Sequence, residues 1–249
     1  MEVRIRDLVP VLTPEEGAAA QQQSQQRLQR QQTLIDSRRA LVLDAARAVF
    51  AEKGIEGASV REIAKRAGYT PGALYSYFDS KEAIYAALLE ESLERLNAQV
   101  DAAREPKNEP RSLPQRLLGI KSQAWFAFFA ENPRDLDLCF YLLQGLAPRG
   151  LTKDLNQQLS ERLAAALRPC EDALLAMGQD APAALRENTA LLAHGVGLLL
   201  LHHTGRIRMF GQSAQELFDA YVEHLVQRLL PGAQALETAN AQTDMFGKI

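Results

Sequence analysis

A stretch of twenty residues, SVREIAKRAGYTPGALYSYF from Ser59 to Phe78, constrains the fold more than any other part of the chain. Ser59 followed by Glu62 is the pattern of a capping box, in which a hydroxyl and a carboxylate satisfy the first amides of a helix. The apolar residues that follow recur at the spacing of one buried helical face: Ile63, Ala64 and Ala67. The stretch therefore begins with a short amphipathic helix.

A tight turn and a second helix come next. Gly68 can adopt the left-handed conformation that closes the first helix, Thr70 offers a hydroxyl cap, and Pro71 suits a first helical position. The second helix is predicted over 71–78. Leu74 and Phe78, four residues apart, give it one apolar side.

The rest of that second helix carries small or hydroxyl-bearing side chains: Gly72, Ala73, Tyr75, Ser76 and Tyr77. Such a surface suits close approach to duplex DNA, where helix N-termini and hydroxyls bind phosphate and small residues enter the major groove. Lys81 adds a cation nearby. The alternative is an ordinary helical hairpin inside a larger bundle.

The run from Ser59 to Glu82, with its LYSYF and DSKEA, resembles the helix-turn-helix of the TetR family of bacterial transcriptional regulators, most closely over 37–84. Tyr69 departs from the family pattern, which commonly has a small aliphatic residue there. The resemblance implies two sets of DNA contacts. Phosphates would be held by Ser59, Tyr75, Tyr77 and Lys81, and base edges would face Arg61, Thr70, Gly72 and Ala73, with Pro71 in the same interface.

Charge is distributed as a DNA-binding protein would need. The 249 residues carry a formal net charge of −3, yet 37–81 hold eight basic and five acidic residues, a local +3. A modestly basic module on an acidic body is typical of a DNA-binding protein whose positive charge is localised.

Residues 1–36 are predicted to be a flexible, glutamine-rich extension, as a frayed helix or disorder, with eight glutamines between Ala18 and Thr33. The TetR resemblance implies that basic residues near this end can enter a minor groove: Arg27, Arg30, Arg38 and Arg39. A solvated tail without a role is the alternative.

The pattern predicts an all-α protein. The first amphipathic helix is expected at 37–53, ended by Gly54, and a long helix from Ser80 joins the 37–84 helix-turn-helix domain to a helical effector-binding and dimerisation domain at 85–230. Within that domain, 152–177 reads as one helix kinked at Pro169, followed by helices at about 182–206 and 213–230. Residues 231–249 are expected to be a flexible tail.

Aromatic residues concentrate in two consecutive predicted helices. They either line an apolar pocket for a small, largely apolar effector, as the resemblance implies, or form plain core. The pocket candidates are Trp125, Phe126, Phe129, Phe140 and Tyr141.

The first of the last two predicted helices is apolar almost all round, so it needs partners on every side. Ala193, Gly195 and Gly197 permit close approach of another helix. A two-fold interface with a second copy follows, and the resemblance implies the same. Its candidate residues are Leu192, Val196, Leu199, His203, Val222, Leu225 and Leu229.

Other classes find less support. Cys139 and Cys170 have no ligand or disulfide spacing, and His194 and His202, eight residues apart, lack a supporting carboxylate or cysteine, so we expect no metal. There is no nucleophile with a base and no glycine-rich phosphate loop, so we expect no enzyme and no cofactor. Without a signal region or a spanning run, the sequence favours a cytoplasmic protein that has no membrane partner.

The resulting prediction is a DNA-binding transcriptional regulator. By resemblance it is a ligand-responsive repressor that binds a palindromic operator as a homodimer. The alternatives are an architectural, ligand-independent DNA-binding protein and a purely protein-binding helical module.

Overall fold

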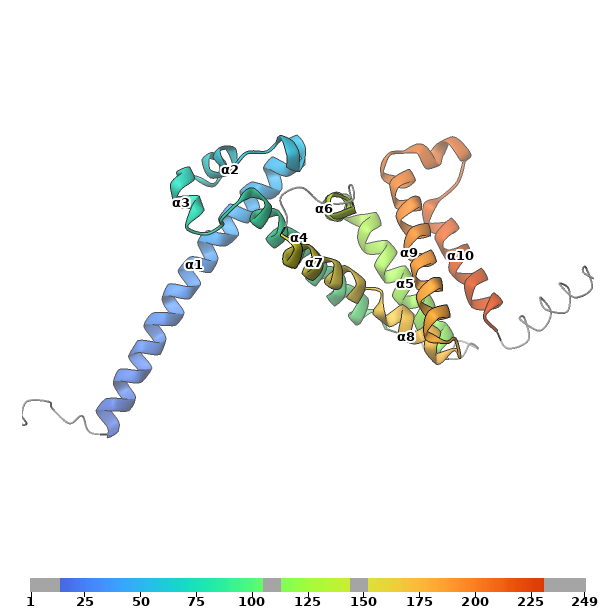
Figure 1. Ribbon diagram of the computed structural model, residues 1–249, viewed down its shortest axis with the longest axis horizontal. Coiled ribbons are helices and arrows are strands. Elements are labelled where there is room, and N and C mark those ends of the chain that lie inside the picture. The colour runs from blue at the N-terminus through green and yellow to red at the C-terminus, as the bar shows by residue number, and fades with distance from the viewer. Residues whose placement is uncertain (1–13, 105–112, 144–151, 231–249) are drawn as a thin grey trace, which may run out of the picture. The chain divides into compact units, whose positions relative to one another are not determined.

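The computed structural model describes residues 14–104, 113–143 and 152–230, and throughout these ranges the regular structure is helical. The chain divides into two compact units, residues 1–81 and 82–249 (Figure 1). The predicted all-α fold is confirmed. We describe each unit by itself.

Unit 1 is built on α1 (Pro14–Gly57), whose last third packs against the first of the two short helices that follow it. The face predicted for burial is the buried one: Val42, Ala45, Ala46, Val49 and Phe50. Gly54 interrupts the regular helix with a φ of 70°, in agreement with its predicted role as a terminator.

The start of α1 differs from the prediction. The helix begins at Pro14 and not at Ser37, so the part of the glutamine-rich extension from residue 14 onward is helical. Few apolar residues occur there, and the described side chains from Gln21 to Leu41 are exposed. Glutamine, alanine and arginine are good helix formers, and the packed end of α1 supplies a nucleus from which the helix can propagate.

The turn between α2 (Val60–Ala67) and α3 (Pro71–Tyr75) follows the predicted capping chemistry. Ser59 and Glu62 form the capping box, and Gly68 adopts a φ of 77° at the end of α2. Thr70 Oγ1 accepts a hydrogen bond from the Ala73 amide at 3.2 Å. However, α3 ends at Tyr75 rather than Phe78, because the amides of Ser76 and Tyr77 turn back to carbonyls only three residues earlier, those of Ala73 and Leu74.

Unit 2 contains the long helix α4 (Lys81–Ala102), which starts at the junction, followed by α5 (Leu113–Glu131) and α6 (Pro133–Leu143). Next come α7 (Lys153–Ala165) and α8 (Arg168–Ala176). The last elements are α9 (Ala181–His203), the 3₁₀ turn η1 (Arg206–Phe210) and α10 (Ala214–Arg228). In this unit α5 packs against α8, α9 and α10.

Two boundaries in unit 2 correct the predictions. The single kinked helix over 152–177 is two helices, because the chain leaves helical geometry near Leu167 and Pro169 then occupies the first turn of α8, where its missing N–H costs nothing. The helix predicted to reach Arg206 ends at His203, and η1 between the left-handed Gly205 and Gly211 was not predicted.

No helix in the described ranges is both long enough and apolar enough to cross a bilayer.

Candidate DNA-binding surface

The predicted DNA-contacting residues of unit 1 lie on α2, on α3 and in the turns that flank them. Arg61, Gly72 and Tyr75 are exposed there, with Tyr75 at 51%. Pro71 is exposed at the first position of α3, and Ala73 is half-buried beside it. A Cβ on Gly72 would meet no atom within 4 Å, so the small size of Gly72 leaves open space rather than filling a tight contact.

The hydroxyls at the starts of the two helices are already used for capping. Ser59 Oγ donates to Glu62 Oε2 at 2.9 Å and accepts from the Glu62 amide at 3.3 Å. The hydrogen bonds from Lys53 and Ser59 hold the pKa of the Glu62 carboxyl below its usual value. Ser59 and Thr70 therefore have a structural role whatever else they contact, and a cap of this kind contributes about 1 kcal/mol to stability.

Lys81 and Tyr77 have partners within unit 1. Lys81 Nζ donates to the Glu56 carbonyl at 3.4 Å, which ties the start of α4 to the end of α1. Tyr77 is half-buried, and its hydroxyl accepts a hydrogen bond from Arg38 Nη1 at 3.4 Å. The side chains of Lys81 and Tyr77 are thus held in place by the rest of the unit.

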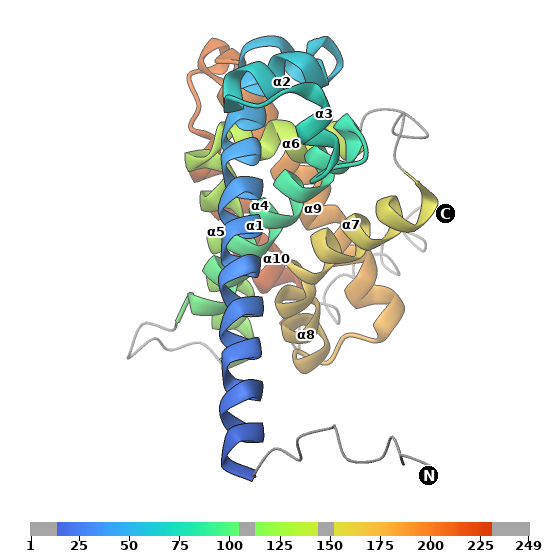
Figure 2. The same cartoon turned by 90° about the vertical axis from the view of Figure 1, so that its left-hand side faces the viewer.

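Two arginines of α1 contact the segment after α3, and the sequence did not reveal these contacts. Arg38 bonds Tyr77, while the Arg39 guanidinium lies 4.3 Å from the centre of the Phe78 ring and donates to the Tyr77 carbonyl at 3.5 Å. The hydrogen bond to Tyr77 raises the pKa of Arg38. Contacts between residues 38 or 39 positions apart leave no local pattern, so only the folded chain brings them together (Figures 1 and 2).

The comparisons with known proteins agree with this geometry. The family model described as bacterial regulatory proteins, tetR family, matches residues 42–88. An uncharacterized HTH-type transcriptional regulator of Bacillus subtilis (strain 168), YdgC, is 33% identical over 135 residues, which are 54% of this chain and 67% of that protein. The chain belongs to the TetR family. The predicted family is thereby confirmed, and with it a DNA-binding transcriptional regulator.

Solved TetR-like structures share the fold of both units. PfmR of Thermus thermophilus has a TM-score of 0.54 at 22% identity, covering 75% of this chain and 97% of PfmR. FadR of Bacillus subtilis, solved in complex with stearoyl-CoA, has a TM-score of 0.50 at 20% identity, covering 78% of this chain and 98% of FadR. At these identities the likeness shows the fold alone.

In the TetR-like chain, three of the predicted pocket residues fill the interior of unit 2. Trp125, Phe126 and Phe129 are buried; the Phe126 ring stacks on Phe218 of α10 at 4.2 Å, and Trp125 packs edge-on against Phe129 at 5.3 Å. Phe140 is half-buried, and the Tyr141 side chain lies outside the described residues. Whether these rings also line an effector cavity stays a prediction.

The predicted interface residues divide into two groups. Leu192, Val196 and His203 are half-buried, and His203 Nε2 lies 2.8 Å from the Phe129 carbonyl oxygen. The other four are buried inside the protomer, and so have little surface left for a partner: Leu199, Val222, Leu225 and Leu229. Periodicity indicated burial correctly for these four, but they are buried within their own chain.

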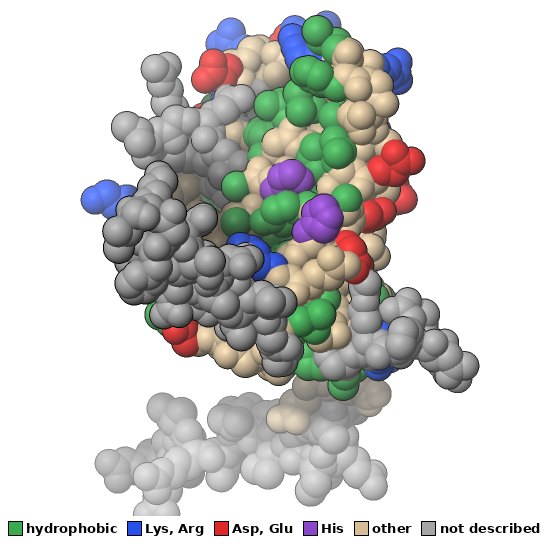
Figure 3. Space-filling model, turned by 90° about the vertical axis from the view of Figure 1, so that its right-hand side faces the viewer, with side chains coloured by type: hydrophobic (Ala, Val, Ile, Leu, Met, Phe, Trp, Pro, Cys, Tyr) green, Lys and Arg blue, Asp and Glu red, His purple; other side chains and the backbone are tan. Residues whose placement is uncertain are grey.

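A different set of residues forms the exposed face of α9 and α10. Hydrophobic side chains and two histidines gather on this side of unit 2 (Figure 3). The exposed members that lie three or four residues apart are Ala190, Ala193, Gly197 and Leu200 on α9, and Ala220 and His224 on α10. Small residues therefore line α9 where another helix would approach.

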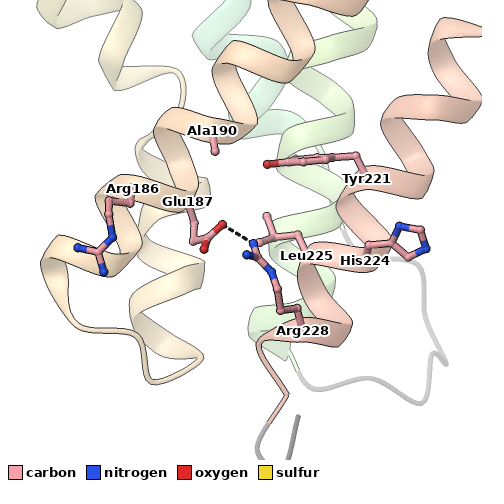
Figure 4. A pocket seen from close by; sticks show the side chains of 7 residues that line it. All are labelled: Arg186, Glu187, Ala190, Tyr221, His224, Leu225 and Arg228. Carbon is pink, nitrogen blue, oxygen red and sulfur yellow. Dashed lines mark hydrogen bonds and ion pairs between the residues drawn. The ribbon is translucent and has the colours of Figure 1, made fainter. Parts of the chain in front are cut away.

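A groove between α9 and α10 opens on this face, with a cavity volume of about 630 Å³. Glu187 and Arg228 close its lower part with a 2.6 Å ion pair, and Tyr221 and Leu225 project from α10 (Figure 4). Tyr221 also stacks on His194 at 4.2 Å. Burial lowers the pKa of His194 and raises that of Tyr221.

The cysteines and histidines show no sign of a metal centre among the described residues, where no group of three potential ligands comes together. Cys139 and Cys170 are free and buried, and burial raises the pKa of each thiol to about 12. Both thiols are therefore neutral and unreactive near pH 7.

Proposed function

We propose that this TetR-family chain is a ligand-responsive repressor that acts in the cytoplasm as a homodimer on a palindromic operator. The proposal is carried by α2 and α3 of unit 1, where Arg61, Gly72 and Tyr75 are each exposed on two helices joined by a well-capped turn. Arginine can give two parallel hydrogen bonds to guanine, and tyrosine can bind a phosphate. The proposed role is regulation and not catalysis.

The α9–α10 face supports the homodimer. It combines small exposed residues on α9 with exposed Leu200 and a groove beside them, an arrangement that admits close helix packing across a two-fold axis. A dimer of this kind would place two α3 helices about one DNA turn apart, which explains why the operator should be palindromic.

The dimer can be tested by sedimentation velocity. Gly197→Arg places a charge on the proposed interface at a site where no atom lies within 4 Å, so the protomer should still fold. It is expected to sediment as a monomer. Leu175→Arg, at an exposed leucine of α8, is the matched control and should stay dimeric. A dimeric Gly197→Arg variant would contradict this interface.

The effector response would pass through α4. This helix starts at the junction with unit 1, and it has buried residues along most of its length. A small, largely apolar effector would bind unit 2 and change the distance between the two helix-turn-helix domains of the dimer. Thermodynamic linkage then requires the effector and the DNA to weaken each other's binding affinity by the same factor. FadR, which has a similar fold, was solved with stearoyl-CoA, so long-chain acyl-CoA is the first probe. Binding is detected by thermal shift. An effector that binds but leaves the DNA affinity unchanged would contradict the linkage.

DNA recognition itself can be tested by fluorescence anisotropy with operator fragments selected from genomic DNA. Arg61→Ala and Tyr75→Ala should each lose sequence-specific affinity while keeping the wild-type unfolding midpoint, because both side chains are exposed. Arg168→Ala, an exposed arginine of α8, is the control and should bind as the wild type does. If the wild type binds none of the selected fragments, the proposed function is wrong.

A further inference from the structure

Three side chains from three separate segments of unit 1 meet beside α3. Arg38 comes from α1, Tyr69 from the turn between α2 and α3, and Tyr77 from the turn after α3. Arg38 Nη1 lies 3.4 Å from the Tyr77 hydroxyl, and the Tyr69 and Tyr77 rings are 6.2 Å apart at an interplanar angle of 56°. Tyr77 thus contacts both a cation and a second ring.

Arg38 differs from three basic residues of unit 1 that are neutralised by a neighbouring carboxylate. Arg47, Lys53 and Arg66 each pair with a carboxylate, from Asp44, Glu62 and Glu52 respectively. Arg38 is exposed and contacts a neutral hydroxyl instead, with no carboxylate pairing recorded within the described ranges. Its positive charge therefore remains available to an anion from another molecule.

Arg39, the next residue, has a different role. Its guanidinium covers the Phe78 ring and donates to the Tyr77 carbonyl, so it fastens α1 to the segment after α3. This anchoring keeps Arg38 and Tyr77 adjacent without using the Arg38 charge.

The direction of the Arg38–Tyr77 hydrogen bond matters. A guanidinium only donates, so the Tyr77 oxygen must be the acceptor and its own proton is free to point elsewhere. The pair therefore presents a cation with unused N–H groups next to a hydroxyl donor. These are the groups that bind a phosphate oxygen, with the guanidinium fork adding geometric fit.

We propose that Arg38 and Tyr77, backed by Tyr69, form a phosphate-binding subsite for the DNA backbone beside α3, in which Arg38 both supplies charge and aligns the Tyr77 hydroxyl. The inference rests on the proposed DNA-binding function and extends it to a residue of α1 outside the segment, 42–88, that the family model matches. The Tyr69 ring lies beside the Tyr77 ring and limits its movement.

The test is a series of anisotropy titrations with a selected operator at several salt concentrations. Arg38→Gln should weaken binding about 10-fold for each protomer of the homodimer, as expected for a charged hydrogen bond. It should also reduce the slope of log affinity against log salt by about 0.9 for each protomer, and so by about 1.8 for the dimer, because each Arg38 supplies one phosphate contact. Tyr77→Phe should weaken binding about 5-fold and leave the slope unchanged, because only a neutral donor is lost.

Three further variants make the assignment specific. The double variant should lose less affinity than the product of the single losses, because Tyr77 depends on Arg38 for its alignment. Arg38→Lys should keep the wild-type slope but lose part of the affinity, since the charge stays and the fork is lost. Arg47→Gln, in the same helix but paired with Asp44, should leave both affinity and slope unchanged.

Unfolding midpoints of the single Arg38 variants should match that of the wild type, because Arg38 is exposed. If the wild type binds its operator and Arg38→Gln alters neither affinity nor salt slope, the subsite is wrong while the proposed function stands. If the wild type binds no operator at all, both fall together.

Discussion

The two units use their side chains differently. In unit 1 the residues that would contact DNA are exposed or half-buried. Polar interactions hold them in position: the Ser59 and Thr70 caps, the Lys81 bond to Glu56 and the Arg38 bond to Tyr77. In unit 2 the described pocket candidates Trp125, Phe126 and Phe129 are aromatic residues that pack in the interior against other aromatic rings. Function and stability should therefore be separable in unit 1 and coupled in unit 2.

The sharpest test of this difference pairs one residue from each unit. Phe126→Ala removes a buried ring that stacks on Phe218, and should lower the free energy of unfolding by about 3–5 kcal/mol in urea titrations. Tyr75→Ala should change it by no more than about 0.5 kcal/mol while abolishing specific DNA binding. Comparable destabilisation by both would show that the two units do not differ in this way.

Two glycines of α9 make a matched pair within unit 2. A Cβ on Gly195 would lie 2.6 Å from Trp125 Cζ3 and 3.1 Å from Phe218, whereas one on Gly197 would meet nothing within 4 Å. Gly195→Ala should cost about 1–3 kcal/mol by overpacking. Gly197→Ala should be neutral or stabilising by up to about 1 kcal/mol. Both are to be measured at one protein concentration, since dimerisation contributes to stability; equal effects would contradict the packing at Trp125.

Within unit 1, Thr70→Ala removes the cap of α3 and should cost about 1 kcal/mol of stability. The loss should be larger than for Tyr75→Ala, although both residues are exposed, because only Thr70 satisfies a backbone amide. Differential scanning calorimetry of the two variants checks this order. Thr70→Ser, which keeps the hydroxyl, is the control and should retain most of the stability.

The smallest expected effect is a pH dependence at the α9–α10 face. Burial lowers the pKa of His194 in the folded chain, so the folded state binds its proton less readily than the unfolded state does. The stabilisation is present above the unfolded pKa of about 6.5 and is lost as pH falls through the folded value. Urea titrations from pH 7.5 to pH 5 should show this fall in the wild type and a smaller one in His194→Gln. An equal fall in both would assign the effect to other groups.

Much of the fold could be predicted from patterns that involve only a few neighbouring residues. The caps at Ser59 and Thr70 each open a helix where the sequence indicated, because a cap depends on residues only two or three positions away. The helices predicted from residues 152 and 213 also begin there, capped by Thr152 and Ser213.

Features that depend on distant parts of the chain were less predictable. Hydrophobic periodicity indicated that Leu199 and Val222 are buried, yet it could not tell burial by α5 and the neighbouring helix from burial by a second copy. The contacts of Arg38 and Arg39 join segments that only folding brings together. The helical start at Pro14 depends on a nucleus more than twenty residues away in α1.

The packed C-terminal part of α1 also affects how fast the backbone amides of this helix exchange their hydrogens. From Gln21 to Leu41 the described side chains lie in water, so the hydrogen bonds of this part can open by fraying, without unfolding of the unit. From Val42 to Phe50 opening requires the packed core to separate. A single continuous helix should thus show a gradient of amide hydrogen exchange, fast at its N-terminal end and slowest where it packs on α2, and the midpoint of that gradient should fall close to Arg38 and Arg39.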